Sequence, residues 1–258
     1  GAVCIGPASP KDSYLRMVQS IGTALALKAE ANHPGFGFLS ENAEFARMCG
    51  QYGIQFVGTS PELIDKMGNK SEAKRTMKAA GIPVVPGTDF PVYEEEEALA
   101  KAKEIGFPIM IKASAGGGGK GMRLAWEEQE FPAKFREAQQ EAENAFADHA
   151  MYLERYIQFP RHIEVQIMAD RHGNVIHLGE RDCSIQRRHQ KMIEESPCAF
   201  ITGETRRKLW ETALKASHAV GYENAGTLEF LLDQSGEFFF MEMNTRIQVE
   251  HPVSELVS

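Results

Sequence analysis

Two glutamates near the end of the chain have the residue type and the spacing of a metal-binding pair. Glu229 lies in an apolar run at 227–233, and Glu242 ends a second apolar run after a polar turn, so the segment predicts a β-hairpin. Two carboxylates on one face of an apolar hairpin repel each other unless a cation lies between them. A hard divalent ion, with phosphate oxygens as further ligands, is the usual solution. Asn244 and Arg246 follow directly and favour such a site.

The predicted register of this hairpin puts the two glutamates within reach of each other. If Leu232 and Glu237 flank a four-residue turn, Glu229 lies opposite Phe240, and Glu242 is its diagonal neighbour on the same face. The alternative is that both glutamates face solvent independently, because alternating strands put polar residues outward.

A glycine-rich loop is the second feature suited to chemistry. Lys112 lies in an apolar run, which is followed by the glycines 116–119, by Lys120 and Gly121, and by another apolar run. The phosphate-binding P-loop pattern fails, because glycine and not Ser or Thr follows Lys120. A glycine loop between two strands is typical of a flap that covers nucleotide phosphates with its backbone N–H groups. The alternative is a flexible linker, which the tight apolar flanks disfavour.

The segment 179–191 is the most polar and basic part of the chain. Side chains that can donate hydrogen bonds fill positions 186–191. In an acidic chain such a cluster favours a site for an oxyanion. The alternative is a solvated surface.

Two further polar residues lie in predicted strands. Glu154 ends an apolar strand, where a carboxylate can accept hydrogen bonds from an adenine or a ribose; a structural salt bridge fits equally well. The run 161–168 alternates, so that His162 shares a face with Glu164 and Gln166. A lone histidine in a strand is more often structural.

Bulk composition restricts the class of protein. The chain has 258 residues, 43% of them hydrophobic, and a net charge of −8, which argues against binding to nucleic acid or to acidic membranes. We expect neither a membrane span nor a leader. The four cysteines are far apart and form no CxxC pair, so we expect reduced thiols and a cytoplasmic location. Both ends interrupt predicted elements, so we expect a piece of a longer protein.

The remaining pattern predicts a mixed α/β architecture in more than one lobe. Strand–helix alternation in the first third predicts a parallel α/β lobe, and the stiff run 82–87 suits a link between lobes. Helices are predicted at 14–29, 40–52 with Ser40 as cap, from Ser60 onward, 71–80 with Ser71 as cap, 94–105, 131–146 and 204–220. Strands are predicted at 54–57, 107–113, 122–125, 151–157 and 161–168, besides the hairpin.

Four motifs together resemble one enzyme family. They are HPGFGFLSEN at 33–42, KASAGGGGKGM at 112–122, SIQRRHQK at 184–191 and EMNTRIQVEHP at 242–252. The chain resembles biotin carboxylases, the ATP-grasp component of biotin-dependent carboxylases, and looks most like the subunit of acetyl-CoA carboxylase. The resemblance covers essentially the whole chain. It implies an ATP-grasp fold (α+β and α/β) with a partial Rossmann-like N-terminal lobe, a small lid domain and a truncated C-terminal lobe.

The implied domains are an N-terminal α/β domain at 1–68 and an ATP-grasp region at 69–258. Within the latter, the lid lies at about 85–155 and the truncated C-terminal lobe at 156–258.

The resemblance implies a ligase reaction in two steps. ATP and bicarbonate give carboxyphosphate and ADP, and the carboxyl group then passes to biotin on a carrier protein. The implied cofactors are ATP and Mg²⁺, with Mn²⁺ as an alternative ion, and biotin is the carried substrate. The implied partners are bicarbonate, a biotin carboxyl carrier protein or domain and a carboxyltransferase, as in fatty acid biosynthesis, and a homodimer is allowed. Neither nucleic acid nor membrane is an expected partner.

The resemblance also assigns roles residue by residue. ATP is implied to contact Lys70, Lys112, Gly118, Gly119, Glu154, Arg155, Tyr156, Ile157, His162, Gln186 and His189. The metal ligands are implied to be Glu229, Glu242 and Asn244. Bicarbonate is implied to bind Lys191, Arg246 and the backbone N–H of Val249, with Glu250 as the base that deprotonates it.

Two other functions stay open at this stage. One is an ATP-grasp ligase of the carbamoyl-phosphate synthetase type, which would use ammonia as acceptor. The other is a fragment that only binds nucleotide or forms a subunit interface. Family members continue with a lobe that carries a further arginine for the biotin enolate, so carboxylation of biotin by this fragment alone is a weaker expectation.

Overall fold

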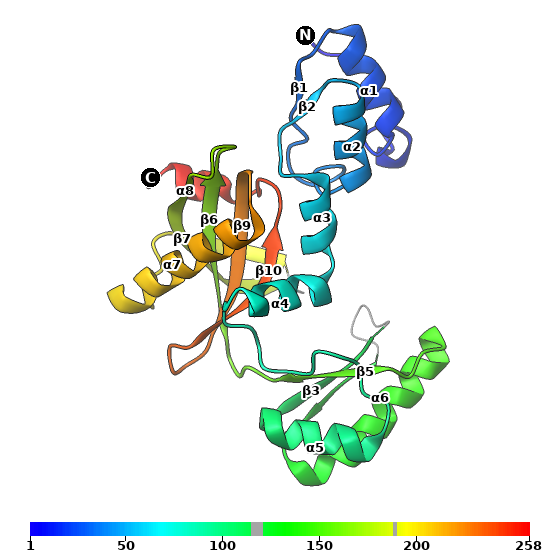
Figure 1. The fold of residues 1–258 in the computed structure, drawn as a ribbon, viewed down its shortest axis with the longest axis vertical. Coiled ribbons are helices and arrows are strands. Elements are labelled where there is room, and N and C mark those ends of the chain that lie inside the picture. The colour runs from blue at the N-terminus through cyan, green and yellow to red at the C-terminus, as the bar shows by residue number, and fades with distance from the viewer. Residues whose placement is uncertain (115–120, 188–189) are drawn as a thin grey trace. The chain divides into compact units, whose positions relative to one another are not determined.

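The computed structural model describes residues 1–114, 121–187 and 190–258. The chain forms two compact units, one made of residues 1–83 and 160–258 and the other of residues 84–159 (Figure 1). We describe each unit by itself. Among the described residues, no helix combines the length and the apolar character that crossing a membrane requires. All four cysteines are free, and three of them are buried.

The N-terminal part of the first unit is a small α/β layer. Its elements are η1 (Pro10–Asp12), α1 (Met17–Ala26), β1 (Ala31–Asn32), α2 (Ala43–Gln51), β2 (Gln55–Phe56), α3 (Pro61–Gly68) and α4 (Lys70–Ala79). The strands β1 and β2 pair in parallel, as the strand–helix alternation predicts. Its core contains Ile21, Phe45, Cys49 and Ile54, all nearly inaccessible to solvent.

The N-termini of three helices show which of two neighbouring polar residues becomes the N-cap. Ser60 caps α3 as predicted, since its side chain accepts a hydrogen bond from the Leu63 backbone N–H. The predictions for Ser40 and Ser71 are wrong, because Asn42 caps α2 and Asn69 caps α4. Asparagine is at least as good an N-cap as serine, and in both cases it lies two residues away from the predicted serine.

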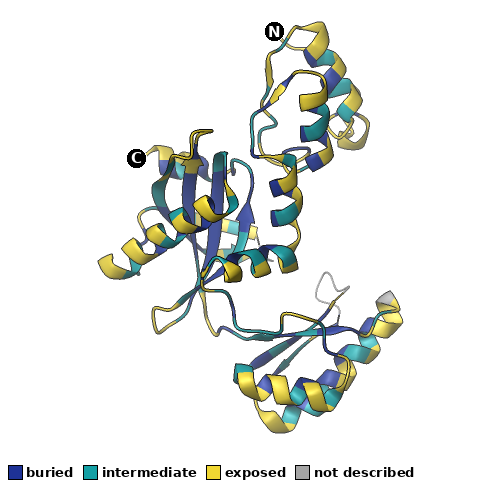
Figure 2. Cartoon of the chain, viewed as in Figure 1, coloured by how far each residue is buried: buried dark blue, intermediate teal, exposed yellow. Residues whose placement is uncertain are grey.

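A five-stranded antiparallel sheet forms the centre of the first unit, with the order β10-β9-β6-β7-β8. Its elements are β6 (Arg161–Ala169), β7 (Val175–Arg187), β8 (Gln190–Glu195), α7 (Gly203–Val220), β9 (Asn224–Leu232), β10 (Phe238–Asn244) and α8 (His251–Glu255). The inner strands are largely buried (Figure 2). Thr202 caps α7 and Gly221 ends it, as predicted.

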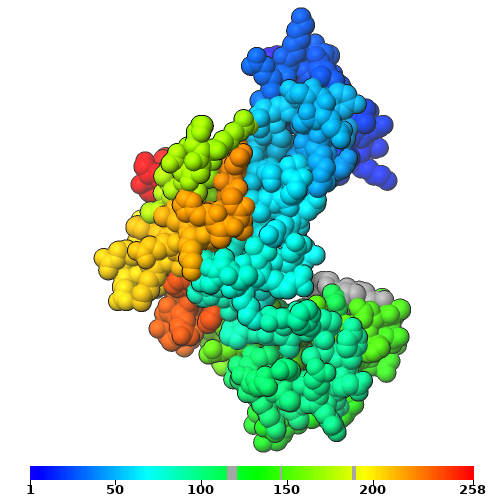
Figure 3. All heavy atoms as spheres, viewed as in Figure 1, coloured from blue at the N-terminus to red at the C-terminus, as the bar shows by residue number. Residues whose placement is uncertain are grey.

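The two faces of this sheet have different characters. Alternation along β6 puts Ile163, Val165 and Ile167 on one face and the polar side chains of His162, Glu164 and Gln166 on the other. The helix α7 packs against β6 and β7, and its outer side forms part of the molecular surface (Figures 1 and 3). The apolar side chains buried in α7 include Leu209, Ala213 and Ala216. The polar face of the sheet is therefore the one that positions chemistry.

The hairpin of β9 and β10 has a different register from the predicted one. Leu232 pairs with Phe238 rather than with Glu237, so the turn is one residue longer than we predicted. A β-bulge between Phe240 and Glu242 then shifts the register again and places Glu242 directly opposite Glu229. Without the bulge, Glu242 would point to the opposite face. The bulge therefore puts both carboxylates on one face, which confirms that part of the prediction.

The long hairpin of β7 and β8 is an element that sequence reading missed. The polar segment 179–191 belongs largely to these two strands. Its mixture of charged and apolar residues lacks a clean period of two, and register shifts interrupt the pairing between β7 and β8.

The second unit is a three-stranded antiparallel sheet with the order β4-β3-β5, covered by two helices. Its elements are α5 (Glu95–Ile105), β3 (Ile109–Ala113), β4 (Met122–Ala125), η2 (Glu128–Glu130), α6 (Phe131–Phe146) and β5 (Met151–Arg155). Apart from η2, which was not predicted, these elements match the predicted ones to within about two residues. Ile109, Ile111, Phe131 and Phe135 belong to its fully buried core.

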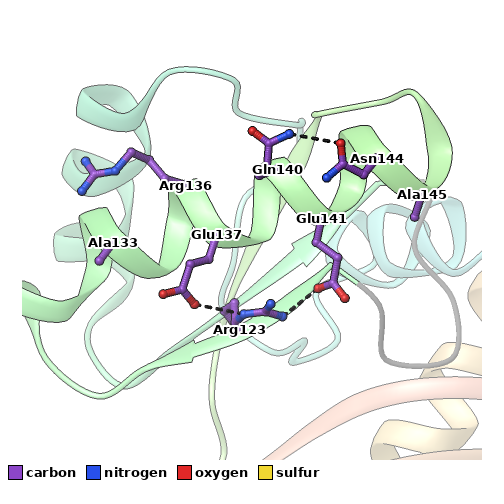
Figure 4. Close-up of a pocket in the computed structure, with 8 residues that line it drawn as sticks. All are labelled: Arg123, Ala133, Arg136, Glu137, Gln140, Glu141, Asn144 and Ala145. Carbon is purple, nitrogen blue, oxygen red and sulfur yellow. Dashed lines mark hydrogen bonds and ion pairs between the residues drawn. The ribbon is translucent and has the colours of Figure 1, made fainter.

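A polar groove runs along the exposed side of α6 in this second unit. Arg123 of β4 donates hydrogen bonds to Glu137 (3.3 Å) and Glu141 (2.7 Å) of α6, and Gln140 donates to Asn144 (Figure 4). These side chains are solvent-exposed or partly so, and they satisfy one another.

Candidate active site

A row of charged residues crosses the polar face of the five-stranded sheet. The residues directly opposite one another in β10, β9, β6 and β7 are Glu242, Glu229, Glu164 and Arg181. Side chains opposite each other in antiparallel strands lie about 5 Å apart at their Cβ atoms. Three carboxylates therefore lie side by side, with a cation at the end of the row.

Lys191 of β8 connects these carboxylates. Its Nζ atom donates hydrogen bonds to Glu164, to Glu229 at 2.9 Å and to Glu250 at 2.7 Å. The lysine side chain is only 18% exposed. The loop after β10 supplies Glu250, so one ammonium group joins β6, β9 and that loop.

The ionisation of this cluster follows from its contacts. Burial alone would lower the pKa of Lys191, but attraction to Glu164 and Glu229 outweighs it and raises that pKa above its ordinary value. Burial would raise the pKa of Glu250, but the hydrogen bond from Lys191, a backbone hydrogen bond and attraction to Lys191 and Arg181 together outweigh it and lower that pKa. At neutral pH, Lys191 is therefore protonated and Glu250 is a carboxylate, the form that can accept a proton.

A buried arginine, Arg181, lies on the same polar face of the sheet. Arg181 is fully inaccessible to solvent and donates from Nε to Glu164 at 2.6 Å and from Nη1 to Gln166 at 3.0 Å. Its guanidinium also donates to Gln248 at 3.0 Å and to Ser254 at 2.8 Å. Arg181 therefore ties the loop and helix after β10 to the middle of the sheet.

Arg246 lies at the start of that loop and is about one quarter exposed. Its Nη1 atom donates to the Ile247 backbone carbonyl at 3.2 Å, and its Nη2 atom donates to Asn244 Oδ1 at 3.4 Å. Asn244 in turn donates from Nδ2 to Glu229 at 2.7 Å. The arginine is thus linked to the row of carboxylates through one amide.

His162 and Gln186 complete the network on the other side of Glu229. The Nε2 atom of His162 lies 3.4 Å from Glu229 Oε2, and Gln186 Nε2 contacts His162 Nδ1 at 2.6 Å. Gln186 also donates to the Cys183 carbonyl. His162 is thus a member of a polar cluster rather than a lone histidine in its strand.

A cavity of about 1220 Å³ opens over this face, which is large enough for a nucleotide. Ten of the residues that sequence reading assigned to the site line it: Lys70, His162, Gln186, Lys191, Glu229, Glu242, Asn244, Arg246, Val249 and Glu250. They come from α4, β6, β7, β8, β9, β10 and the following loop.

The donor atoms fit a hard divalent ion. Glu229 and Glu242 face each other across the hairpin, and Asn244 adds an amide beside them. Among the described residues no group of three or more His, Cys, Asp or Glu side chains is arranged to hold a metal. A pair of carboxylates with few other protein ligands is the usual arrangement for Mg²⁺ that shares its shell with phosphates. Lys70 Nζ lies 3.3 Å from Glu242 Oε2.

The other predicted residues lie elsewhere. In the second unit, Lys112 of β3 forms an ion pair with Glu154 of β5, so the salt bridge expected as an alternative for Glu154 is present. Arg155, Tyr156 and Ile157 also belong to this unit, where the Tyr156 ring contacts Trp126 edge to face. The predictions for Gly118, Gly119 and His189 fall outside the described residues.

Sequence reading assigned no role in this network to Glu164, Arg181 and Gln248, among others. The alternating pattern along 161–168 put Glu164 on the same face of the strand as His162, and this pattern was the signal that could have identified Glu164. Arg181 and Gln248 could not be connected to it, because their partners depend on the registers of strands distant in sequence.

The fold and the site define an ATP-grasp protein. Residues 69–258 match the family described as "Carbamoyl-phosphate synthase L chain, ATP binding domain", and residues 1–64 match "Biotin carboxylase, N-terminal domain". The chain is 56% identical to the biotin carboxylase of Nostoc over its whole length and spans 58% of that protein.

Comparison with solved structures also finds biotin carboxylases. The crystal structure of a biotin carboxylase–β-γ-ATP complex from Campylobacter jejuni matches with a TM-score of 0.84 and 53% identity, over 99% of this chain and 57% of that one. The bicarbonate-bound biotin carboxylase domain of a thermophilic 2-oxoglutarate carboxylase matches with a TM-score of 0.91 and 47% identity, over 97% of this chain and 55% of that one. The chain belongs to the biotin carboxylase family. It spans a little over half the length of these relatives.

Proposed function

We propose that the protein that contains this chain carboxylates biotin with ATP and bicarbonate through a carboxyphosphate intermediate. The observation that carries the proposal is the cavity in which Lys191, Glu229, Glu242, Arg246 and Glu250 meet. It combines a place for a metal, donors for an anion and a carboxylate able to act as base. The relatives solved with β-γ-ATP and with bicarbonate support both ligands.

Glu229, Glu242 and Asn244 would hold Mg²⁺, or Mn²⁺ in its place. The ion would neutralise charge on the phosphates of ATP as the terminal phosphoryl group moves. Lys70, at the start of α4 and beside Glu242, would contact the same phosphates.

Arg246, Lys191 and the backbone N–H of Val249 would bind bicarbonate, and Glu250 would remove its proton. Bicarbonate becomes a competent nucleophile only after that proton has been removed. A guanidinium can hold such an anion through two parallel N–H groups, which a lysine cannot do. If Lys191 turned toward the anion, it would weaken its own hydrogen bond to Glu250. The pKa of Glu250 would then rise and make it a stronger base.

His162, Gln186 and His189 would contact the ribose and phosphates. In the second unit, residues 154–157 would line the adenine pocket, Lys112 would contact phosphates, and Gly118 and Gly119 would lie in the lid. We propose the domain division 1–68, 69–258 with the lid at about 85–155, and the C-terminal lobe from 156. The family matches at 1–64 and 69–258 and the compact unit 84–159 support this division.

The biological setting is a finer part of the proposal. We assign the protein to the first half-reaction of an acyl-CoA carboxylase, with acetyl-CoA carboxylase of fatty acid biosynthesis as the first candidate. A biotin carrier, a carboxyltransferase and a second copy would be its partners in the cytoplasm. One relative is the biotin carboxylase domain of a 2-oxoglutarate carboxylase, which supports the proposal that this site does not determine the final acceptor.

One titration separates this function from its nearest rival. We expect hydrolysis of Mg-ATP by the full-length protein to rise with bicarbonate and to rise further with free biotin. Ammonia in place of biotin should have no effect. Stimulation by ammonia and not by biotin would favour a ligase of the carbamoyl-phosphate synthetase type, and turnover indifferent to bicarbonate would overturn both. The same titration on this chain alone shows what the fragment retains.

A further inference from the structure

A carboxylate from the N-terminal part of the first unit contacts the arginine of the site. Glu41 accepts a hydrogen bond from the Thr245 backbone N–H at 3.1 Å through one oxygen. Its other oxygen accepts from Arg246 Nε at 3.0 Å. One side chain therefore holds both the backbone and the guanidinium at the point where β10 ends. Glu41 belongs to the motif at 33–42, to which the proposed function assigns no role.

The segment around Glu41 is built to hold it in place. The chain turns through Gly37 and Phe38, which both have positive φ, and the Ser40 N–H donates to the Gly37 carbonyl at 3.0 Å. Leu39 and Ser40 are buried on one side of Glu41, and on the other side Asn42 caps α2. Because the backbone is held in place on both sides of Glu41, its side chain leaves the backbone in a defined direction.

The contact determines which donors of Arg246 are left for an anion. Glu41 occupies Nε, while Ile247 and Asn244 each accept one bond from Nη1 and Nη2. Each Nη atom has a second N–H. Two N–H groups of one guanidinium can bind a planar oxyanion at two points. Rotation of the guanidinium would misalign them.

The ion pair between Glu41 and Arg246 contributes little to the stability of the fold, so stability does not explain its presence. The side chains of Glu41 and Arg246 are 40% and 23% exposed, and ion pairs as exposed as these stabilise proteins only weakly. An ordinary surface pair would involve side chains alone, as between Arg47 and Asp65. Glu41 instead also binds the backbone of Thr245, which is itself buried.

We propose that Glu41 is a positioning residue that orients Arg246 for binding bicarbonate. The inference rests on the proposed function, because it takes the anion at Arg246 to be bicarbonate. The proposal assigns Glu41, and with it the motif at 33–42, to the site that binds the anion. Loss of Glu41 should weaken binding of bicarbonate and leave binding of ATP unchanged.

The test compares Glu41→Gln and Glu41→Ala with the control Glu44→Gln in the full-length protein. Glu44 lies in the first turn of α2, and its ion pair is with Arg47 on the surface. The first measurement is the KM for bicarbonate and for ATP. We expect Glu41→Ala to raise the KM for bicarbonate roughly tenfold, as for loss of a hydrogen bond to a charged group, and Glu41→Gln to raise it less. The KM for ATP should stay within about twofold, and the control should match the wild type.

The second measurement is the NMR signal of the Arg246 Nε–H group in the full-length protein, assigned by its loss in Arg246→Lys. We expect the signal to move and to exchange faster with water in both Glu41 variants but not in Glu44→Gln. An unchanged signal together with an unchanged KM for bicarbonate would overturn the proposed role of Glu41. If the wild type itself shows no dependence on bicarbonate, the proposed function fails. The NMR result then still decides whether Glu41 orients Arg246.

Discussion

The two units of this chain differ in whether the charged side chains of their sheets lie at the surface or are buried. The sheet of the second unit has an apolar core, and its charges, such as those of Arg123, Glu137 and Glu141, pair at the surface of α6 (Figure 4). The polar face of the first unit's sheet instead buries Arg181 and Glu164 almost completely.

Burying charges in this way is a poor means of gaining stability, because the cost of desolvation offsets most of the attraction. The first unit keeps these charges out of water, where they act more strongly on a ligand, whereas the charges of Arg123, Glu137 and Glu141 in the second unit are exposed or partly so.

The largest expected effect is on stability and separates the two units directly. Arg181→Met leaves Glu164 buried without its guanidinium, so we expect a loss of about 3–5 kcal/mol in the free energy of unfolding. Urea unfolding, followed by a probe in the first unit such as the fluorescence of Trp210, measures it. A loss below about 1 kcal/mol would show that the buried network is not held together by this arginine.

Removing Lys191 should give a somewhat smaller effect that depends on pH. In the wild type, Glu250 has a lowered pKa and stabilises the fold above the ordinary carboxyl value of 4.5; this contribution is lost as the pH falls through the folded-state pKa. In Lys191→Met, the carboxylate of Glu250 loses its ammonium partner and lies near the carboxylates of Glu164 and Glu229, which raises the pKa of Glu250 in the folded state. The repulsion is absent at low pH and destabilises the fold as the pH rises through that pKa.

We therefore expect Lys191→Met to lose about 3 kcal/mol at about pH 8 and clearly less at about pH 5. Urea unfolding at both pH values measures the difference. Equal losses would mean that the lysine does not compensate these carboxylates.

Replacing Glu242 by glutamine tests the metal pair with little change in stability, since this side chain is about one third exposed. We expect Mg-dependent ATP hydrolysis by the full-length protein to fall by about 10- to 100-fold, because the amide is a much weaker magnesium ligand than the carboxylate. A wild-type rate at every Mg²⁺ concentration would assign Glu242 a purely structural role.

The smallest effect should come from the second unit. Arg123→Met removes surface pairs with Glu137 and Glu141, so we expect a change of less than about 1 kcal/mol in the free energy of unfolding. It is the matched control for Arg181→Met. A loss as large as that of Arg181→Met would remove the contrast between the two units.

Much of the local structure could be predicted from the sequence, because local rules decide it. The cap at Ser60, the stop at Gly221 and the helix at 131–146 follow from neighbouring residues alone. Long-range pairing is different. The bulge at 240–242 has no local signature that we could use, yet it decides which face Glu242 occupies.

The site was partly predictable for the same reason. Residues that lie close together in the chain, such as Glu242, Asn244, Arg246 and Glu250, reveal one another by their spacing. Arg181 and Glu41 are visible only in the fold, since they act through partners from distant segments.

The central claim, that bicarbonate attacks the terminal phosphate of ATP in this cavity, has a direct test with ¹⁸O-labelled bicarbonate. An oxygen of bicarbonate that forms a bond to phosphorus stays on the phosphate when carboxyphosphate breaks down at its carbon–oxygen bond. We expect the full-length protein to release inorganic phosphate that carries one labelled oxygen per turnover, and Arg246→Lys to release such phosphate far more slowly. Phosphate that takes its new oxygen from water alone would contradict the account.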